Sequence, residues 1–350
     1  MSIDTRSAAA DIRRARDENP KMRERDLAAK LGISEAEFVA AFVGHGATRL
    51  RADVDAFIHG AAALGEVLAL TRNESAVHEK IGVYDKQVTG EGASMLLGAD
   101  IDLRIFPKLW VHAFAVEKAD GDEVRRSIQF FDAAGEAVHK LHLRPASDLV
   151  AYAALVERLR HYDQSDAVAI MPSQSTVRVP AAFEREELRE RWRGMSDVHQ
   201  FPGMLRQLKL TRHEAVRGVG DDIAWMLDAS AAAETLHRAS AGDVPVMCFV
   251  GSRGCIQIHS GPVKDIRPMG PWINVLDETF HLHLRTDHIR EVWAVRKPVK
   301  EGHVTSVEAY GADGDLIIQF FGQRKEGRVE RDDWRALAES LPRIARTSAA

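Results

Sequence analysis

The sequence predicts an α+β fold built as a tandem duplication, in which each unit has a large antiparallel sheet and flanking helices. First, 350 residues exceed the usual size of a single hydrophobic core. Second, helix-type and strand-type apolar patterns follow one another in the same order twice along the chain. Third, a shift of 179 positions aligns residues 67–142 with 246–321 without a gap. Only about ten aligned positions are identical, so the shared apolar pattern is the main support for an internal repeat.

The first unit begins with helical patterns at 4–17 and 24–31. Ser34 and Glu37 have capping-box spacing, which predicts a helix that runs to about Val43 and ends at Gly44 or Gly46. Short apolar or alternating runs, separated by turn residues, then predict an antiparallel meander. Its strands are expected at 67–70, 95–97, 101–106, 110–116, 127–131 and 137–143, and a helix at 148–160 closes the unit.

The second unit repeats this order. Helical patterns lie at 186–193 and 204–208, and Thr211 and Glu214 have the spacing of another capping box. The expected strands are 246–250, 256–259, 280–284, 292–295, 306–310 and 316–321. Ser, Gln, Pro and small residues interrupt the periodic pattern at 163–182, so we predict a first repeat at 1–165, a linker at 166–182 and a second repeat at 183–350. A ligand cleft is expected between the two halves.

Composition excludes several classes of protein. A net charge of -5 and a pI near 6.3 argue against general nucleic-acid binding, which needs a concentrated basic surface. The polar N-terminus lacks the apolar core of a signal peptide, and the longest apolar runs are too short to cross a bilayer. We therefore expect a cytoplasmic protein that is not membrane-embedded. Cys248 and Cys255 are expected to be buried free thiols.

Common catalytic and metal-binding motifs are absent. The chain has no GxxxxGK[ST], GxGxxG or GxSxG sequence, so a nucleotide enzyme or a serine hydrolase is not indicated. His281 and His283 point the same way on a predicted strand, but no further ligand stands at a zinc-site spacing. These histidines are therefore expected to be polar residues on a solvated face of the sheet.

The segment 192–201 contains the most informative histidine. Ser196 or Asp197 can cap a helix start, which would place His199 in the first turn with Phe201 close by. A helix N-terminus disfavours the imidazolium, and neutral imidazole is the form that binds a metal. Spacing alone nevertheless favours an ordinary surface histidine over a ligand.

Four stretches carry a resemblance to a known family. Asp197-Val-His-Gln-Phe201 resembles the heme-ligand segment of the bacterial hemin-degrading or hemin-transport factors, the HemS, HmuS and ChuS type. The other stretches are Arg72-Asn-Glu-Ser-Ala-Val-His-Glu-Lys80, Ile101-Asp-Leu-Arg-Ile-Phe106 and Ile317-Ile-Gln-Phe-Phe-Gly-Gln-Arg324. The similarity extends from Met22 to about Arg328 and includes the helix that begins at Leu210-Thr-Arg212.

The resemblance implies a binding site for heme b, as ligand or substrate. It makes His199 the proximal iron ligand and Arg104 the distal residue, which would orient bound oxygen if the protein were an enzyme. Arg212, Lys297, Gln319 and Arg324 match positions that line the cleft and hold the propionates, and guanidinium groups suit carboxylates. Phe106 and Phe249 are candidates for porphyrin packing, and His78 for a second heme contact.

Each of these residues also has a simpler interpretation. Arg104 alternates with apolar neighbours, so it can be an exposed strand arginine, and Lys297 before Pro298 can face solvent. His78 can be a structural polar residue. Pro202 stands where relatives usually carry an aromatic residue, and we expect it to bend the helix and change the aim of His199.

Three functions are compatible with this resemblance. A carrier would accept heme from an inner-membrane heme ABC importer and pass it intact to an acceptor such as a heme oxygenase, in support of iron utilisation. An enzyme would open the porphyrin with electrons from an outside reductase, because the sequence offers no reductase site of its own. The third possibility is a protein that stores or senses heme. The sequence leaves monomer and homodimer equally open.

Overall fold

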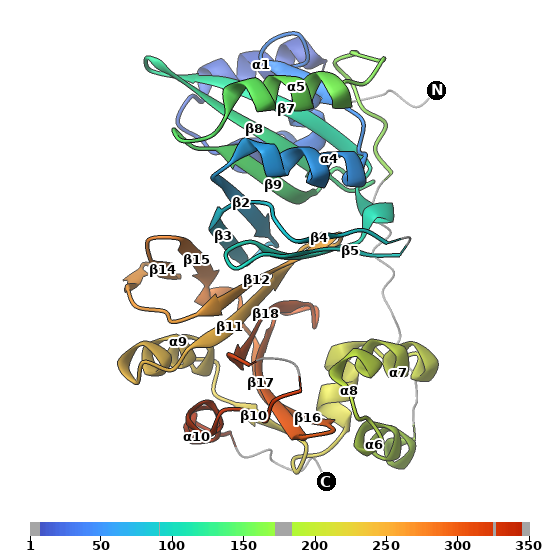
Figure 1. Cartoon of the computed structure of the whole chain (residues 1–350), viewed down its shortest axis with the longest axis vertical. Coiled ribbons are helices and arrows are strands. Elements are labelled where there is room, and N and C mark those ends of the chain that lie inside the picture. Colours follow the sequence, from blue (N-terminus) through green and yellow to red (C-terminus); the bar gives the residue numbers. More distant parts are fainter. Residues whose placement is uncertain (1–7, 91, 172–183, 325–326, 345–350) are drawn as a thin grey trace. The chain divides into compact units, whose positions relative to one another are not determined.

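The computed structural model describes residues 8–90, 92–171, 184–324 and 327–344. These residues form two compact units, and each unit includes a short segment from the other half of the chain. Unit 1 includes the short segment 251–257, and unit 2 includes 73–78. Figure 1 shows the first unit mainly in blue and green and the second mainly in yellow and red. Among the described residues, every helix is too short or too polar to span a lipid bilayer.

Unit 1 is an antiparallel sheet with helices on both faces. Its sheet runs in the order β1 (Ala47–Leu50), β7 (His112–Asp120), β8 (Glu123–Phe131), β9 (Ala137–Leu143), β2 (Val67–Arg72) and β3 (Ala76–Gly82). A second group of strands follows the start of β12 (Cys255–Gly261), in the order β6 (Asp102–Ile105), β5 (Ser94–Leu97) and β4 (Gln87–Val88). The helices are α1 (Ala9–Glu18), α2 (Glu24–Leu31), α3 (Glu35–Ala40), α4 (Val54–Ala61) and α5 (Leu149–Leu159), with short 3-10 turns at Ala62–Leu64 and Pro107–Leu109.

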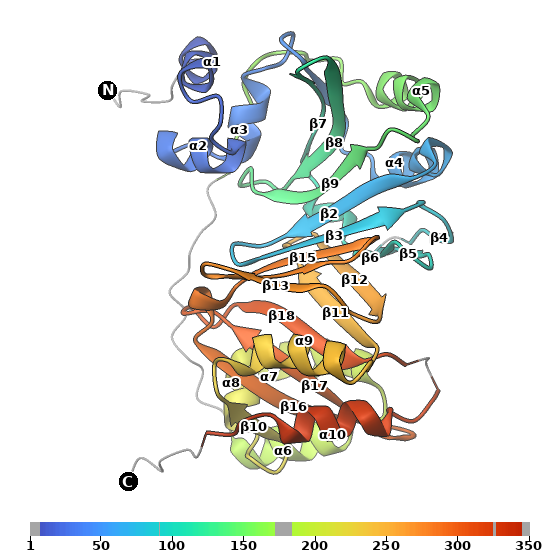
Figure 2. The same cartoon turned by 90° about the vertical axis from the view of Figure 1, so that its left-hand side faces the viewer.

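Strand alternation divides the apolar side chains of unit 1 between two cores. Helices α4 and α5 cover one face, where Phe57 packs against Phe130 and Trp110. Helices α1 to α3 cover the other face over Phe114 and Phe131. Figure 2 shows these two helix groups on opposite sides of β7, β8 and β9. Because successive side chains of a strand point to opposite faces, both groups of helices bury apolar surface of the same sheet.

Unit 2 has the same organisation. Its sheet runs β10 (Ala224–Leu227), β16 (Glu291–Val299), β17 (Gly302–Tyr310), β18 (Leu316–Gly322), β11 (Val246–Gly251) and β12 (Cys255–Gly261). Strands β15 (Phe280–Arg285), β14 (Trp272–Leu276) and β13 (Ile266–Met269) continue from the start of β3. The helices are α6 (Arg185–Arg193), α7 (Phe201–Leu208), α8 (Arg212–Gly218), α9 (Ala231–Ala241) and α10 (Asp332–Ser340), with 3-10 turns at η3 (Val198–Gln200) and Thr286–His288.

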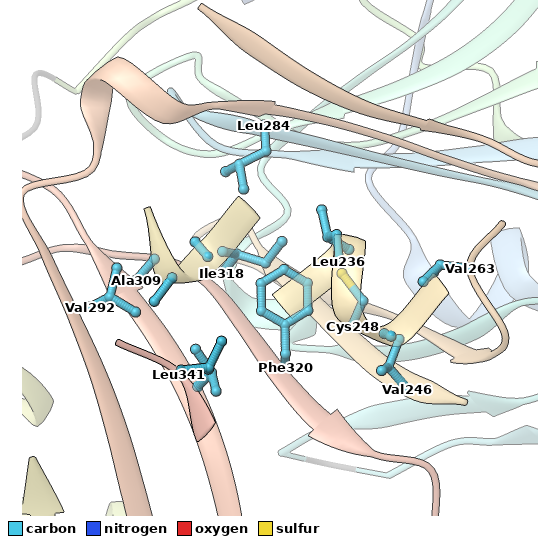
Figure 3. Packing of buried hydrophobic residues seen from close by; sticks show 14 of the residues in the cluster. Leu236, Val246, Cys248, Val263, Leu284, Val292, Ala309, Ile318, Phe320 and Leu341 are labelled. Atoms are coloured by element: carbon cyan, nitrogen blue, oxygen red, sulfur yellow. The ribbon is translucent and has the colours of Figure 1, made fainter. Parts of the chain in front are cut away.

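The two faces of the unit 2 sheet also bury different cores. Helices α9 and α10 cover the face that carries Cys248, Ile318 and Phe320, and Figure 3 shows this packing from close by. Helices α6, α7 and α8 cover part of the other face, around Trp293 and Tyr310. The side chains of Lys297, Glu308 and Gln319 alternate with the first core, so they point to the α6–α8 face.

The structure confirms the predicted fold class and most of the predicted elements. Helix α2, strand β9 and the two capping boxes, Ser34–Glu37 and Thr211–Glu214, are as expected. Cys248 and Cys255 are buried free thiols. The helix after Ser34 is shorter than predicted, because it ends at Ala40 and the chain turns into β1 through Gly44 and Gly46 with positive φ.

Several elements were not predicted from the sequence. These are strands β1, β3, β4, β10, β13 and β14 and helices α4, α9 and α10. Strands β1, β4, β10, β13 and β14 have only two to five residues, which carry too little periodicity to be recognised without knowledge of the neighbouring strand. The three helices become recognisable only when the face of the sheet that they cover is known. The predicted linker lies partly outside the described residues, and the domain limits 1–165 and 183–350 stay predictions.

A buried carboxylate stabilises the start of α3. Glu35 is buried and forms ion pairs with Arg72 and Lys140. Burial by itself raises the pKa of this carboxyl, but the charges of Lys140 and Arg72 outweigh it and lower the pKa to about 2.

This arrangement predicts a specific acid sensitivity of unit 1. The folded pKa of Glu35 lies below its ordinary value, so its stabilisation is complete above about pH 4.5 and is lost as the pH falls towards 2. The wild-type protein should lose about 3 kcal/mol of unfolding free energy from this group over that interval. In Glu35→Gln this part of the pH dependence should be absent, as measured by urea denaturation at a series of pH values. Glu66→Gln, at an exposed ion pair with Arg144, should keep the wild-type slope; equal slopes in all three proteins would contradict the prediction.

Candidate functional site

His199 is presented on a short, tightly bonded turn. Asp197 caps η3, and its Oδ1 accepts the backbone N–H of His199 at 2.8 Å. Gln200 Oε1 accepts the backbone N–H groups of Ser196 at 2.8 Å and Asp197 at 3.2 Å, which completes a capping box. The His199 side chain is 77% exposed. The predicted cap is therefore confirmed, although the turn is a 3-10 helix rather than the first turn of α7.

The turn is anchored to the sheet of unit 2 by its neighbours. The Lys300 backbone N–H donates to the carbonyl of Ser196 at 3.1 Å. The indole N–H of Trp192 donates to the carbonyl of Arg296 at 2.8 Å, and its ring packs edge-on against Phe201. We expected Pro202 to bend the helix, and this expectation was wrong. Pro202 lies in the first turn of α7, where a backbone N–H has no helical partner to lose.

A buried carboxylate of unit 2 binds most of the residues that were predicted to hold the propionates. Glu308 on β17 is fully buried and accepts hydrogen bonds at both oxygens. The donors are Lys297 at 2.6 Å, Ser306 at 2.7 Å, Tyr310 at 2.5 Å, Gln319 at 2.9 Å, and Arg212 at 3.1 and 3.3 Å. Arg212, Lys297 and Gln319 therefore converge on one acidic side chain, which the sequence analysis did not single out.

Burial and charge shift the protonation of this cluster strongly. Burial by itself raises the pKa of the Glu308 carboxyl, but the charges of Lys297 and Arg212 outweigh it and hold the pKa well below its ordinary range. Burial lowers the pKa of Lys297 to about 8, against the opposing charge of Glu308. Burial also raises the pKa of Tyr310 well above its ordinary value. At neutral pH the cluster thus holds two cations, one carboxylate and a neutral phenol.

Aromatic rings surround the cations. The guanidinium of Arg212 and the ammonium of Lys297 lie over the ring of Phe201, 4.8 and 5.2 Å from its centroid. Lys297 is also 5.9 Å from the ring of Phe321, which packs edge-on against Phe249 at 5.1 Å. Phe201 is buried and cannot serve as an exposed stacking partner, whereas Phe249 and Phe321 are only half-buried. The side chain of Arg212 remains 27% exposed.

Arg324 lies just after β18, within the electrostatic reach of the histidine turn. The backbone hydrogen bond from His199 and, to a lesser degree, the positive charge of Arg324 hold the pKa of Asp197 below its ordinary value. His199, Arg212, Lys297, Gln319, Arg324 and Phe249 thus all belong to unit 2, on the face shared with α6–α8 or next to it.

The remaining candidates are placed differently. Arg104 and Phe106 belong to unit 1; Arg104 is half-exposed on β6 and forms an ion pair with Asp102, while the backbone of Phe106 bonds to Gly254. His78 belongs to unit 2, is 0% exposed and packs on Phe280, with ring centroids 5.0 Å apart. An imidazole buried so deeply cannot meet a ligand without movement of the chain. The predicted cleft stays a prediction.

Sequence reasoning missed four residues of the candidate site: Asp197 as a side-chain partner of His199, Glu308, Tyr310 and Phe321. Glu308 had one available signal, since an acidic residue in the middle of an apolar strand must be compensated when it is buried. Its partners come from four separate elements, which no local pattern connects. In the described part of the chain, no group of three or more His, Cys, Asp or Glu side chains is arranged to hold a metal ion.

Fold and site together define a duplicated α+β protein whose second unit presents an exposed imidazole near aromatic rings and cations. The haemin-degrading HemS.ChuX domain matches the chain twice, at residues 32–159 and 209–341. The chain belongs to this family.

Relatives over the full length support this membership. The hemin transport proteins HmuS of Yersinia pestis and HemS of Yersinia enterocolitica are 40% and 41% identical to the chain, over 92% of the chain and 93% of each relative. The crystal structure of holo-PhuS, a heme-binding protein from Pseudomonas aeruginosa, has a TM-score of 0.92 and 42% identity and covers 97% of this chain and all of that one. ChuS, a heme-degrading enzyme of Escherichia coli O157:H7, has a TM-score of 0.89 and 34% identity, with coverage of 96% of this chain and all of that one.

The Glu308 cluster generates a stability prediction. Glu308→Ala should lower the unfolding free energy of unit 2 by about 3–5 kcal/mol, because the cations Lys297 and Arg212 lose the buried carboxylate that compensates their charge. The double variant Glu308→Leu/Lys297→Met should recover part of this loss, since it removes a buried charge of each sign. Urea denaturation of the ligand-free protein measures both effects. Glu301→Ala, at an exposed glutamate between β16 and β17, should change stability by no more than about 0.5 kcal/mol; a similarly small effect at Glu308 would contradict the role of the cluster.

Proposed function

We propose that the protein is a cytoplasmic heme-binding protein of heme uptake and iron utilisation, which accepts imported heme b and delivers it to an acceptor. The observation that carries this proposal is the exposed imidazole of His199 on the same unit as the aromatic rings and cations described above. Family membership, holo-PhuS and the hemin transport relatives support heme as the ligand. In this proposal heme is the cargo, and the protein supplies its surroundings.

The residues of unit 2 match the chemical parts of heme. Heme is an apolar disc with two carboxylates and an iron atom, so it needs aromatic or aliphatic contacts, cations and a nitrogen ligand. His199 provides the nitrogen, because its Nδ1 bonds to Asp197 and its Nε2 has no hydrogen bond within the described residues. Phe249 and Phe321 offer half-buried aromatic surface, and Arg212 and Arg324 offer guanidinium groups for the propionates.

The Glu308 cluster suits a carboxylate ligand. Arg212 uses a single nitrogen to bond Glu308, so the rest of its guanidinium group remains available to a second acceptor. Glu308 neutralises one of the two neighbouring cations, which leaves a surplus of one positive charge at this point of the site. A propionate placed there would complete the charge balance.

Heme degradation is the second candidate function, because ChuS, a relative of the same fold, is a heme oxygenase. In that role Arg104 would be the distal residue that orients bound oxygen, a role that rests on the family resemblance. An arginine donates hydrogen bonds but has no lone pair for iron, so it would leave a coordination position exchangeable. An external reductase would be required. For the carrier, an inner-membrane heme ABC importer is the proposed donor and a heme oxygenase the proposed acceptor.

The first test is a hemin titration. His199→Ala should remove most of the Soret shift and weaken hemin binding by about tenfold or more, because the iron loses its nitrogen ligand. His237→Ala, at an exposed histidine of α9 in the same unit, should bind hemin as the wild type does. An unchanged spectrum and affinity in His199→Ala would exclude this residue as the ligand.

The second test separates carrier from enzyme. The hemin complex is incubated aerobically with an electron donor, with and without catalase, and tetrapyrroles are recovered and identified. For a carrier we expect catalase to abolish heme loss, since only peroxide damage consumes heme, and no ring-opened product to accumulate. A ring-opened product that forms in the presence of catalase, and that is reduced in Arg104→Ala, would establish the enzyme instead.

A further inference from the structure

The Asp197 carboxylate contacts both the backbone and the ring of His199. Its Oδ1 accepts the His199 backbone N–H at 2.8 Å and lies 2.8 Å from ring atom Nδ1. Many capping residues make the first contact, because it satisfies the exposed N–H at the start of a helix. The second contact is not needed for capping. It ties the orientation of the imidazole to the orientation of the turn.

This second contact selects one form of the neutral ring. A carboxylate only accepts hydrogen bonds, so the shared proton must be on Nδ1 of His199. Neutral imidazole carries a single ring proton, and therefore the lone pair is on Nε2, the atom that faces away from Asp197. A negative partner on Nδ1 also makes the opposite nitrogen a stronger electron donor.

Asp197 is itself held in place from two directions. Gln200 Oε1 accepts its backbone N–H at 3.2 Å, and the Lys300 N–H bonds the carbonyl of the preceding Ser196 at 3.1 Å. The positive charge of Arg324 also acts on its carboxylate. Although the imidazole is exposed, its supporting carboxylate thus belongs to a turn that is bonded to the end of β16.

A second imidazole–carboxylate pair in the same unit is built differently. His213 bonds Glu291 through Nε2 at 2.8 Å, both side chains are mostly buried, and the ring of His213 packs on Tyr310. That contact joins α8 to β16 within the protein. The Asp197–His199 pair is exposed, and its Nε2 points away from the carboxylate, which is the arrangement expected where the ring must bind something outside the chain.

We infer that Asp197 is a positioning residue for His199: it holds the imidazole as the Nδ1–H tautomer, with Nε2 aimed outward, and strengthens Nε2 as an iron ligand. The consequence for iron rests on the proposed function. The consequence for the tautomer concerns only the protein without ligand, and the two can therefore be tested separately.

The tautomer is tested by nitrogen-15 NMR of the ligand-free protein at pH 8.5. We expect Nδ1 of wild-type His199 to have the chemical shift of a protonated nitrogen and Nε2 that of an unprotonated one. Asp197→Asn should retain this pattern, because its amide oxygen still accepts a hydrogen bond. In Asp197→Ser, which keeps a helix cap with a shorter side chain, the two tautomers should mix. A mixture in the wild type, or no change in Asp197→Ser, would overturn the inference.

The effect on iron is tested with hemin on the same variants. Asp197→Ser should weaken hemin binding about 10–100-fold, the usual effect of losing such a supporting partner. In the ferrous complex, the iron–histidine stretching frequency should fall in Asp197→Asn and Asp197→Ser, because each removes the negative charge. Glu291→Gln is the matched control and should leave the frequency unchanged. An unchanged frequency in both Asp197 variants would overturn the donor-strength part, whereas failure of wild-type hemin binding through His199 would contradict the proposed function and leave the NMR result standing.

Discussion

The candidate site of the second unit, on the sheet face next to α6–α8, depends on the burial of one carboxylate, Glu308. A charge removed from water is tolerated only when it is paired and fully hydrogen-bonded, and this one has donors from β16, β17, β18 and α8. Those donors include three of the residues predicted to hold propionates. Because each donor is required by Glu308, the strands and the helix must meet in one arrangement, and this arrangement positions Arg212 and Lys297 over Phe201.

The first unit meets the same physical requirement with different residues. Gln129 and Ser127 occupy the positions that correspond to Glu308 and Ser306, and their side chains bond each other at 3.0 Å. The buried carboxylate is instead Glu35, which follows the capping serine of α3 as Arg212 follows the capping threonine of α8. Its partner Lys140 corresponds to Gln319. Each unit thus has a buried carboxylate that is paired with cations. In unit 1 this carboxylate belongs to a helix, and in unit 2 it belongs to a strand.

The corresponding lysines show how this difference separates the two units. Lys297 is buried between Glu308 and aromatic rings, whereas Lys118 is exposed and forms an ion pair with Glu24. Unit 1 has Gln129 where unit 2 has Glu308, so Lys118 has no carboxylate to pair with at that position and pairs with Glu24 instead. The residues implied by the family resemblance are accordingly concentrated in unit 2, and the imidazole of His199 has its carboxylate partner there.

The sequence by itself determined the duplication, the two capping boxes and most strands of the central meanders. These features are local or periodic, so a few neighbouring residues are enough to specify them. The convergence on Glu308, the burial of Phe201 and the short strands β1, β10, β13 and β14 were decided only by tertiary structure. Arg212, Lys297 and Gln319 are far apart in the chain, and only the pairing of β16, β17 and β18 brings them to one carboxylate. Burial and charge compensation depend on which elements meet in space, and no single segment of the chain contains that information.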